Sequence, residues 1–139
     1  MTAGISEQRN PYKGEPQRAW LRLILRPKNG VLRELDFLAD TGSPCALVLS
    51  EAAMAQLTWG KTSTADTNFG PLAGGWLRLT MPELGLDEFM PGYASEEVVA
   101  SAKQNSPDFE GLVGLPVLRL GEYGGDADSF WFRGRKKPT

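Results

Sequence analysis

Phe37-Leu38-Ala39-Asp40-Thr41-Gly42-Ser43 is the stretch of sequence that decides the fold. An apolar run ends there in an aspartate, a turn follows, and a second apolar run comes directly after it at residues 46–49. Asp-Thr-Gly alone is a weak signal, because it occurs by chance in roughly 3% of chains of this length and because Asp and Gly are favoured in ordinary turns. An ordinary surface turn, however, does not need apolar strands on both sides. The context therefore favours a carboxylate held inside a cleft.

Two strands joined by a tight turn are expected before this stretch. In residues 20–26, leucines at every second position alternate with arginines, which is typical of a strand buried on one face. Lys28-Asn29-Gly30 follows, and Asn-Gly between apolar stretches is a strong hairpin signal because both residues tolerate positive φ. Residues 31–39 are then the return strand, which ends at Asp40.

A short helix and a long loop are expected after the turn. Ser50 is a good N-cap for a helix that runs through Leu57, with an acidic residue in the positive first turn. Residues 58–75 are rich in Gly, Thr, Ser and Asp. We expect them to form a long, mobile connection of the kind that serves as a lid or a binding loop.

The second half of the chain reads as further strands and one more helix. Ser95 is expected to open a helix that ends near Lys103, and residues 109–120 are apolar. Pro91-Gly92 is expected to break the strand in which it lies. The three further strands are expected at residues 76–81, 89–93 and 129–132.

Many short strands with two short helices predict a mostly-β single domain. The chain of 139 residues has room for one core. We place the domain at residues 18–133. Residues 1–17 are expected to be a flexible lead-in and residues 134–139 a basic tail.

The composition excludes some classes of partner. The net charge of -2 comes from 15 basic and 17 acidic residues scattered along the chain, which gives no reason to expect a nucleic acid or a membrane. The one basic cluster lies at the C-terminus and reads as a solvated tail. It consists of Arg133, Arg135, Lys136 and Lys137.

The absences narrow the chemistry. The chain has no histidine, which excludes Ser-His, Cys-His and His-ligated metal chemistry. Its single cysteine, Cys45, cannot form an internal disulfide and is expected to be a small buried residue. Neither a signal peptide nor a membrane span is expected, so we expect a cytoplasmic protein. Carboxylates are the most plausible source of any chemistry.

Two motifs together carry a resemblance to a known family. Leu38-Ala39-Asp40-Thr41-Gly42-Ser43 resembles the active-site motif of the retropepsin-like aspartic proteases. About seventy residues later, Gly111-Leu112-Val113-Gly114-Leu115-Pro116-Val117-Leu118 is similar to their second signature. The resemblance covers residues 19–132. It departs from the family at residues 82–108, where the Ser95 helix is not a standard element, and at Pro116, where many relatives carry a charge.

The resemblance implies a closed, β-barrel-like acid protease domain that is active as a homodimer without a cofactor or metal. Asp40 would be one of two carboxylates, about 3 Å apart, that share a proton and activate water. Thr41 would hydrogen-bond across the two-fold axis, and Gly42 would allow close approach of the partner. Ser43 would donate a hydrogen bond to the outer oxygen of Asp40. The apolar-glycine segment Gly111-Leu112-Val113-Gly114 would pack against the catalytic loop.

One Asp-Thr-Gly per chain requires a second chain for a two-carboxylate site. Asp66-Thr67-Asn68 is the nearest second candidate, but it lacks the glycine and the apolar lead-in strand. Asp126 and Asp128 lie in a Gly-rich turn after the second signature. All three aspartates read more simply as solvated loop acids. The expected assembly is an isologous homodimer with Asp40 of each subunit at the axis.

The family also implies where a peptide or protein substrate would bind. Residues 58–75 would be the flap, and Trp59, Phe69 and Trp76 are candidates for flap or pocket walls; alternatively, they pack the loop onto its own core. The strand at residues 129–132 would join a dimer-interface sheet or would instead be an edge strand within one chain.

Three hypotheses therefore stay open. The first is an aspartic endopeptidase that uses Asp40 from each of two subunits. The second is a catalytically silent dimer of the same fold that binds peptides or serves as a scaffold. The third is an unrelated β-domain with a chance Asp-Thr-Gly. An intact Asp40, Thr41 and Gly42 favours the first over the second, since a binding module has no need for a buried pair of like charges.

Overall fold

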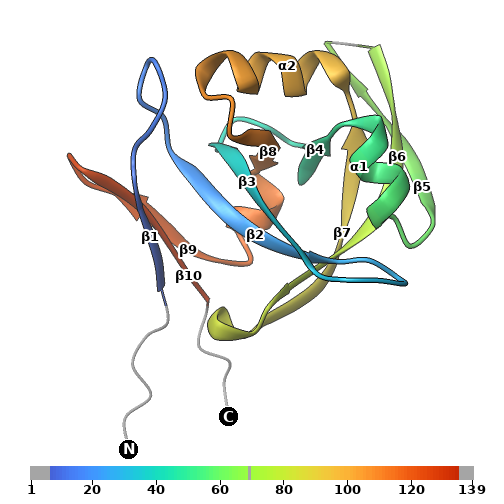
Figure 1. Ribbon diagram of the computed structural model, residues 1–139, viewed down its shortest axis with the longest axis horizontal. Helices are drawn as coiled ribbons and strands as arrows, with labels where there is room; N and C mark the ends of the chain where they lie inside the picture. Colours follow the sequence, from blue (N-terminus) through green and yellow to red (C-terminus); the bar gives the residue numbers. More distant parts are fainter. Residues whose placement is uncertain (1–6, 69, 135–139) are drawn as a thin grey trace, which may run out of the picture.

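The computed structural model describes residues 7–68 and 70–134. These residues contain ten strands, three α-helices and a short 3-10 helix (Figure 1). In chain order they are β1 (Glu7–Pro11), β2 (Trp20–Arg26), β3 (Arg33–Asp40), β4 (Leu47–Leu49), α1 (Glu51–Leu57), β5 (Lys61–Thr67), β6 (Gly70–Met81), the 3-10 helix (Pro82–Leu84), β7 (Leu86–Ala94), α2 (Glu96–Asn105), β8 (Phe109–Gly114), α3 (Leu115–Leu118), β9 (Gly121–Gly125) and β10 (Ser129–Gly134).

Seven strands form one sheet, and six of them close into a barrel. Their order is β2-β3-β8-β4-β7-β6-β5. The C-terminal part of β6 also pairs with β2, through Leu25 opposite Leu79, so the ring β2-β3-β8-β4-β7-β6 is complete. β5 extends the sheet by pairing with the N-terminal part of β6. The expected mostly-β, barrel-like domain is confirmed.

β8 is inserted between β3 and β4, although those two strands are consecutive in the sequence. It runs parallel to β3 and antiparallel to β4. The loop from β3 to β4 must therefore cross over the end of β8. Two backbone hydrogen bonds tie it there, from the Gly114 N–H to the Ala46 carbonyl (2.9 Å) and from the Leu115 N–H to the Ser43 carbonyl (3.0 Å).

The leucine face of β2 lies in the barrel core, as its alternation predicts. Leu21, Leu23 and Leu25 are almost fully buried, and they pack with Phe37 of β3. Ser50 caps α1 by accepting a hydrogen bond from the Ala53 N–H at 3.1 Å. The predicted start and end of this helix are both correct.

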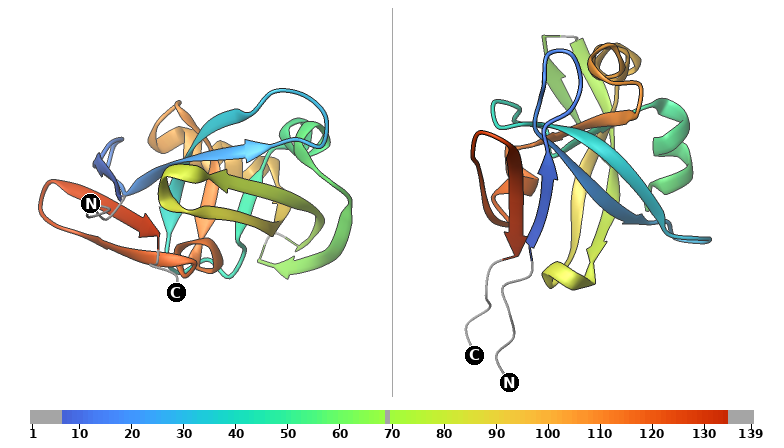
Figure 2. Two further views of the ribbon diagram at one scale, coloured as in Figure 1. Left: turned by 90° about the horizontal axis from the view of Figure 1, so that it is seen from below. Right: turned by 60° about the vertical axis from the view of Figure 1, so that its left-hand side comes forward.

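β1, β10 and β9 form a second, three-stranded sheet to one side of the barrel (Figure 2). β1 lies within the stretch expected to be a flexible lead-in, but it pairs with β10 from Glu7 opposite Arg133 to Pro11 opposite Ser129. β10 also pairs with β9 on its other side. The last strand, β10, is thus the central strand of this sheet and not an edge strand, because β1 from the start of the chain pairs with its free side.

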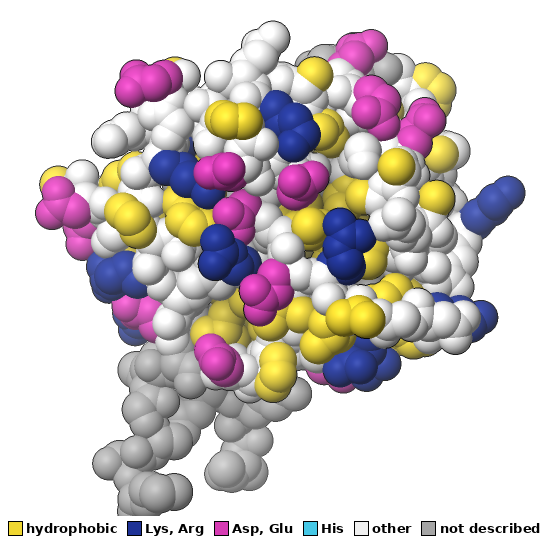
Figure 3. Space-filling view, viewed as in Figure 1, with side chains coloured by type: hydrophobic (Ala, Val, Ile, Leu, Met, Phe, Trp, Pro, Cys, Tyr) yellow, Lys and Arg dark blue, Asp and Glu magenta, His cyan; other side chains and the backbone are white. Residues whose placement is uncertain are grey.

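Arg133 belongs to this sheet and not to a solvated tail. Its guanidinium donates to Glu7 at 3.0 Å and lies over the Trp131 ring, 4.2 Å from its centroid. The other three members of the C-terminal basic cluster lie outside the described residues. On the face seen in Figure 3, acidic and basic side chains are interspersed between apolar ones.

Residues 58–75 are more regular than the expected mobile connection. Most of them form a hairpin of β5 and the first half of β6. Their content of Gly, Thr and Ser indicated a loop. Polar strands that pair in a hairpin do not show the alternation of apolar and polar residues by which a strand is recognised in the sequence. No helix within residues 7–68 and 70–134 is long and apolar enough to cross a membrane.

β7 runs without a break through Pro91-Gly92, contrary to expectation. β4 pairs with β7 from Gly92 onward, so Pro91 stands where β7 has a partner on one side only. A missing N–H is tolerated at such an edge position. Gly92 is needed because Leu77 packs directly against its backbone.

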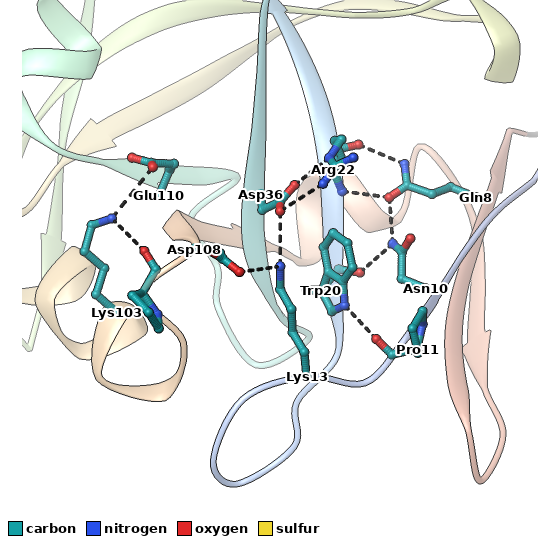
Figure 4. A network of polar contacts seen from close by, with 11 residues as sticks. Gln8, Asn10, Pro11, Lys13, Trp20, Arg22, Asp36, Lys103, Asp108 and Glu110 are labelled. Atoms are coloured by element: carbon teal, nitrogen blue, oxygen red, sulfur yellow. Dashed lines mark hydrogen bonds and ion pairs between the residues drawn. The ribbon is translucent and has the colours of Figure 1, made fainter.

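A polar network joins the connection between β1 and β2 to the barrel (Figure 4). Lys13 contacts Asp36 of β3 at 3.1 Å, and its ammonium group lies 3.8 Å from the centroid of the Trp20 ring. Arg22 of β2 contacts the other oxygen of Asp36 at 2.8 Å. Asp36 thus accepts hydrogen bonds from two cations on different segments, and its side chain is only 12% exposed.

Asp36→Asn is expected to lower the free energy of unfolding and to weaken its dependence on pH. Burial alone would raise the pKa of Asp36, but hydrogen bonds from Arg22 and Lys13 outweigh burial and hold it below 3.8. A carboxylate with a lowered folded-state pKa stabilises the fold above its unfolded-state pKa, and the contribution is lost as the pH falls through the folded-state value. Urea unfolding at neutral pH and near pH 3 measures both effects.

Asp108→Asn is the matched control, because Asp108 also faces Lys13 but at 3.8 Å and with a side chain that is 71% exposed. It should change stability little. The unmodified chain should lose free energy of unfolding between neutral pH and pH 3, and Asp36→Asn should lose less. If Asp36→Asn loses as much as the unmodified chain and Asp108→Asn do, the role assigned to Asp36 is wrong.

Candidate active site

Asp40 lines a cavity of about 530 Å³. The floor of this cavity comes from the barrel strands, one wall from α2, and another from the tip of the β5–β6 hairpin. The size is in the range of sites that enclose part of a ligand.

The floor is a row of apolar side chains across three neighbouring strands. Leu112 of β8 stands opposite Leu38 of β3 on one side and opposite Val48 of β4 on the other. All three residues line the cavity. Asp40 comes two residues after Leu38, so it projects from the same face of β3. A carboxylate is thereby placed at the end of an apolar floor.

The loop after Asp40 is held by its own backbone. The Gly42 N–H donates to Asp40 Oδ1 at 2.9 Å, and the Ser43 N–H donates to the Asp40 carbonyl at 3.1 Å. Asp40 is half-buried, whereas Thr41, Gly42 and Pro44 are exposed. The carboxylate therefore reaches the cavity while the apex of its loop faces outward.

The family resemblance implied that the Ser43 hydroxyl donates a hydrogen bond to Asp40. In the structure, Ser43 does not make this bond. Its hydroxyl accepts from the Cys45 N–H at 3.2 Å and donates to the Cys45 carbonyl at 3.3 Å. The hydroxyl group of Ser43 thus stabilises the turn into β4. Serine side chains often bond to the backbone of near neighbours in this way. Gly42 supplies the hydrogen bond to Asp40 instead.

Gly114 is the residue of the second signature that lies nearest to Asp40. It stands directly opposite Asp40 in the parallel pairing of β3 and β8. A Cβ atom here would collide with the carbonyl oxygens of Cys45 and Ser43. The crossing loop can approach the end of β8 only because position 114 has no side chain.

The rest of the second signature packs beneath the loop. Gly111 and Val113 are buried, and each faces a residue of β4, Leu49 and Leu47 respectively. Only Leu112 reaches the cavity. Within the second signature, the backbone contacts with the loop after Asp40 come from Gly114 and Leu115, whereas Gly111 and Val113 pair with β4.

The hairpin of β5 and β6 forms one wall through residues near its tip. Asp66, Thr67, Asn68 and Leu72 line the cavity. Asp66 is exposed, as expected of a solvated acid, but it lies in β5 and lines the same cavity as Asp40. Phe69, a candidate pocket residue, lies outside the described residues.

α2 forms the opposite wall through a single stripe of its surface. Val98, Ser101, Ala102 and Asn105 line the cavity, and their spacing of three, one and three residues is that of one helix face. The helix was expected from the sequence, but no role in a site was expected for it. The stripe includes the buried Ala102 as well as the exposed Ser101, so no simple polar or apolar pattern marks it in the sequence.

Trp59 and Trp76 are not brought to this cavity. Trp59 packs edge-on against Phe89, with ring centroids 5.2 Å apart, and its indole N–H donates to the Arg26 carbonyl at 2.8 Å. Trp76 is 41% exposed and stands opposite Pro91. The contacts of Trp59 agree with the second of the two expectations, in which it packs residues 58–75 onto the core and does not line a pocket.

Cys45 carries the one thiol among the described residues that line the cavity. It lines the cavity but is only 7% exposed, and burial raises the pKa of its thiol. A neutral thiol is a poor nucleophile. Asp40 is therefore the better placed of the two groups for chemistry in this cavity.

Comparison with known proteins gives one structural similarity. The chain is similar to the crystal structure of a retropepsin-like aspartic protease from Rickettsia conorii, with a TM-score of 0.48 and 16% sequence identity over 92% of this chain and 99% of that chain. This is a member of the family that the two motifs resemble. No protein-family model matches the chain, and no curated protein matches it.

Gly114→Ala is expected to lower the free energy of unfolding by about 1–3 kcal/mol or more, because the atoms that a Cβ would meet belong to backbone carbonyls that cannot rotate away. Chemical denaturation followed by circular dichroism measures the loss. Gly60→Ala is the control, since a Cβ at Gly60 meets nothing within 4 Å. It should stay within about 0.5 kcal/mol of the unmodified chain. Equal losses for both variants would contradict the steric role of Gly114.

Proposed function

We propose that this chain is an aspartic endopeptidase whose active site forms between two identical subunits. The observation that carries the proposal is Asp40 itself: a half-buried carboxylate at the end of an apolar cleft, on a loop whose apex faces outward. One chain supplies one such loop. Two loops that meet at a two-fold axis would supply the pair of carboxylates that hydrolysis of a peptide bond requires.

The chemistry of such a pair is general acid–base catalysis. One Asp40 carboxylate takes a proton from a water molecule, whose oxygen attacks the carbonyl carbon of the scissile peptide. The other Asp40 is protonated and donates a hydrogen bond to the carbonyl oxygen, which stabilises the tetrahedral intermediate. Proton transfer to the amide nitrogen then lets the carbon–nitrogen bond break, and the two products are a carboxylic acid and an amine.

The neighbours of Asp40 support this assignment. The Gly42 N–H at 2.9 Å orients Oδ1 of the carboxylate. Thr41 is exposed at the apex, where it would face its copy in the partner subunit. The β5–β6 hairpin would act as the flap: it would cover an extended substrate and exclude water from the reacting bond.

Asp40→Asn is expected to abolish peptide cleavage, with a loss of at least about 1,000-fold in kcat, and to leave the fold intact. An amide cannot accept the proton of the attacking water. A peptide library incubated between pH 4 and 7 and analysed by mass spectrometry measures cleavage, and circular dichroism checks the fold. Asp128→Asn is the control, because Asp128 is an exposed loop acid away from the cavity.

The Asp40 assignment is overturned if Asp40→Asn cleaves as fast as Asp128→Asn. Absence of cleavage by the unmodified chain over the whole library would favour the second candidate function, a catalytically silent dimer that binds peptides or serves as a scaffold.

Mixing unmodified and Asp40→Asn chains tests whether the site needs two subunits. If subunits exchange freely, one equivalent of the variant should reduce activity per unmodified chain to about one half, and nine equivalents to about one tenth. A site complete within one chain would show no decrease. Sedimentation equilibrium on the same samples establishes whether dimers are present at the concentrations assayed.

Asp66 offers the competing arrangement, in which both carboxylates come from one chain, because it lines the same cavity. Asp66→Asn separates the two arrangements. It should retain measurable cleavage if the second carboxylate is Asp40 of the partner. A loss as complete as that of Asp40→Asn, together with undiminished activity in the mixing experiment, would place the pair within one chain.

A further inference from the structure

Arg18 brings a positive charge into the cleft of Asp40. It lies in the connection between β1 and β2 and lines the cavity opposite the barrel floor. Among the described residues that line this cavity it is the one Lys or Arg, beside the two acids Asp40 and Asp66. Most charged residues of a small domain point to open solvent, so a cation at a cleft is a candidate contact for a ligand.

Its guanidinium has no carboxylate partner within residues 7–68 and 70–134. Four other arginines of the described chain are ion-paired, and they are Arg9, Arg22, Arg78 and Arg133. Arg26, Arg33 and Arg119 have no ion pair there either, but none of them lines the cavity. The side chain of Arg18 is exposed at the cavity wall. It is therefore available to an anionic group that enters the cleft.

The backbone of Arg18 is fixed by contacts on both sides. Lys13 and Arg18 exchange two backbone hydrogen bonds of 3.2 and 2.8 Å. The Glu15 N–H donates to the Asn105 carbonyl at 3.0 Å, and the Asn105 side-chain amide donates to the Pro16 carbonyl at 2.7 Å. Asn105 is the last residue of α2 and itself lines the cavity. The loop that carries Arg18 is thus attached to the end of the α2 wall.

The two ends of the α2 wall differ in charge. Figure 1 shows the loop between β1 and β2 at the C-terminal end of α2 and the tip of the β5–β6 hairpin at its N-terminal end. Arg18 lies at the first end and Asp66 at the second. From Val98 to Asn105 the helix rises about 10 Å, which is the length of about three residues of an extended peptide. A bound peptide that lies along this wall would meet a positive and a negative end.

We propose that Arg18 forms a subsite that selects an acidic side chain of the substrate. The inference rests on the proposed function, since it assigns a specificity to the same cleft. An arginine binds a carboxylate through two parallel N–H···O bonds, whereas a neutral amide of the same shape accepts one at most. Because the site is partly open to water, the expected discrimination between Glu and Gln is about 5- to 10-fold in kcat/KM.

The test uses pairs of peptides that differ only by Glu or Gln at one position, scanned on each side of a cleaved bond. The unmodified chain should cleave the Glu peptide about 5- to 10-fold faster at one position. Arg18→Ala should cleave both members of the pair equally, and Arg18→Lys should keep part of the preference. Arg18→Glu should invert it and favour a Lys-containing peptide at the same position.

Arg119→Glu is the matched control, because it makes the same change of net charge at an exposed residue outside the cavity. It should keep the preference for Glu. Loss of the preference in this variant would mean that the overall charge, and not a subsite, is responsible, and it would overturn the proposal. Equal cleavage of Glu and Gln at every position by the unmodified chain would overturn it as well and would leave the peptidase function standing.

Binding to the Asp40→Asn chain separates the subsite from the catalysis. Fluorescence anisotropy with the same labelled peptides should show tighter binding of the Glu member, and an added Arg18→Ala change should remove the difference. If this is found and the unmodified chain cleaves nothing, the proposed function fails while the acidic subsite remains. If neither binding nor cleavage distinguishes Glu from Gln, the subsite is rejected.

Discussion

The insertion of β8 between β3 and β4 is the constraint on which the rest of the structure depends. Because β3 and β4 are consecutive, their connecting loop must cross the end of the strand between them, and the hydrogen bonds from Gly114 and Leu115 hold it there. The loop can neither lie flat on the sheet nor retreat into solvent. Asp40, at its start, is fixed relative to three strands at once. A catalytic carboxylate needs this kind of rigid support.

The same crossing would leave the proposed site incomplete within one chain. The apex at Thr41 and Gly42 is exposed because the loop stands above the end of the sheet, where no further element of the described chain covers it. A rigid, exposed loop that carries a carboxylate is suited to contact with a copy of itself, since each copy presents the same surface about a two-fold axis. Like charges brought together in this way cannot both remain ionised, so they share a proton. Dimer assembly and acid–base chemistry would then both depend on the exposed loop that begins at Asp40.

Features that depend on near neighbours were mostly predictable from the sequence, although the expected break at Pro91-Gly92 is absent. Features that depend on distant contacts were not predictable. The alternation at β2, the cap at Ser50 and the strand before Asp40 depend on near neighbours, and all three are present. β1 was missed because its stability comes from pairing with β10, more than a hundred residues away. The role of Ser43 was misassigned because its local contact with Cys45 competes with Asp40. The stripe of α2 that lines the cavity lies in the segment where the chain departs from the family pattern, so only the fold shows which residues it faces.

The network around Asp36 connects stability to the shape of the cleft. Asp36 and Asp40 belong to one strand, so their separation is set by the rise of β3. Lys13, held by Asp36 and by the Trp20 ring, begins the short loop that ends at Arg18. The far side of that loop is attached to Asn105 of α2. The backbone of Arg18 is therefore held at a defined position relative to Asp40. The connection runs through the Lys13–Asp36 ion pair and along β3. Folding thus fixes the backbone of Arg18, and only its exposed side chain has to be ordered when a charged group binds.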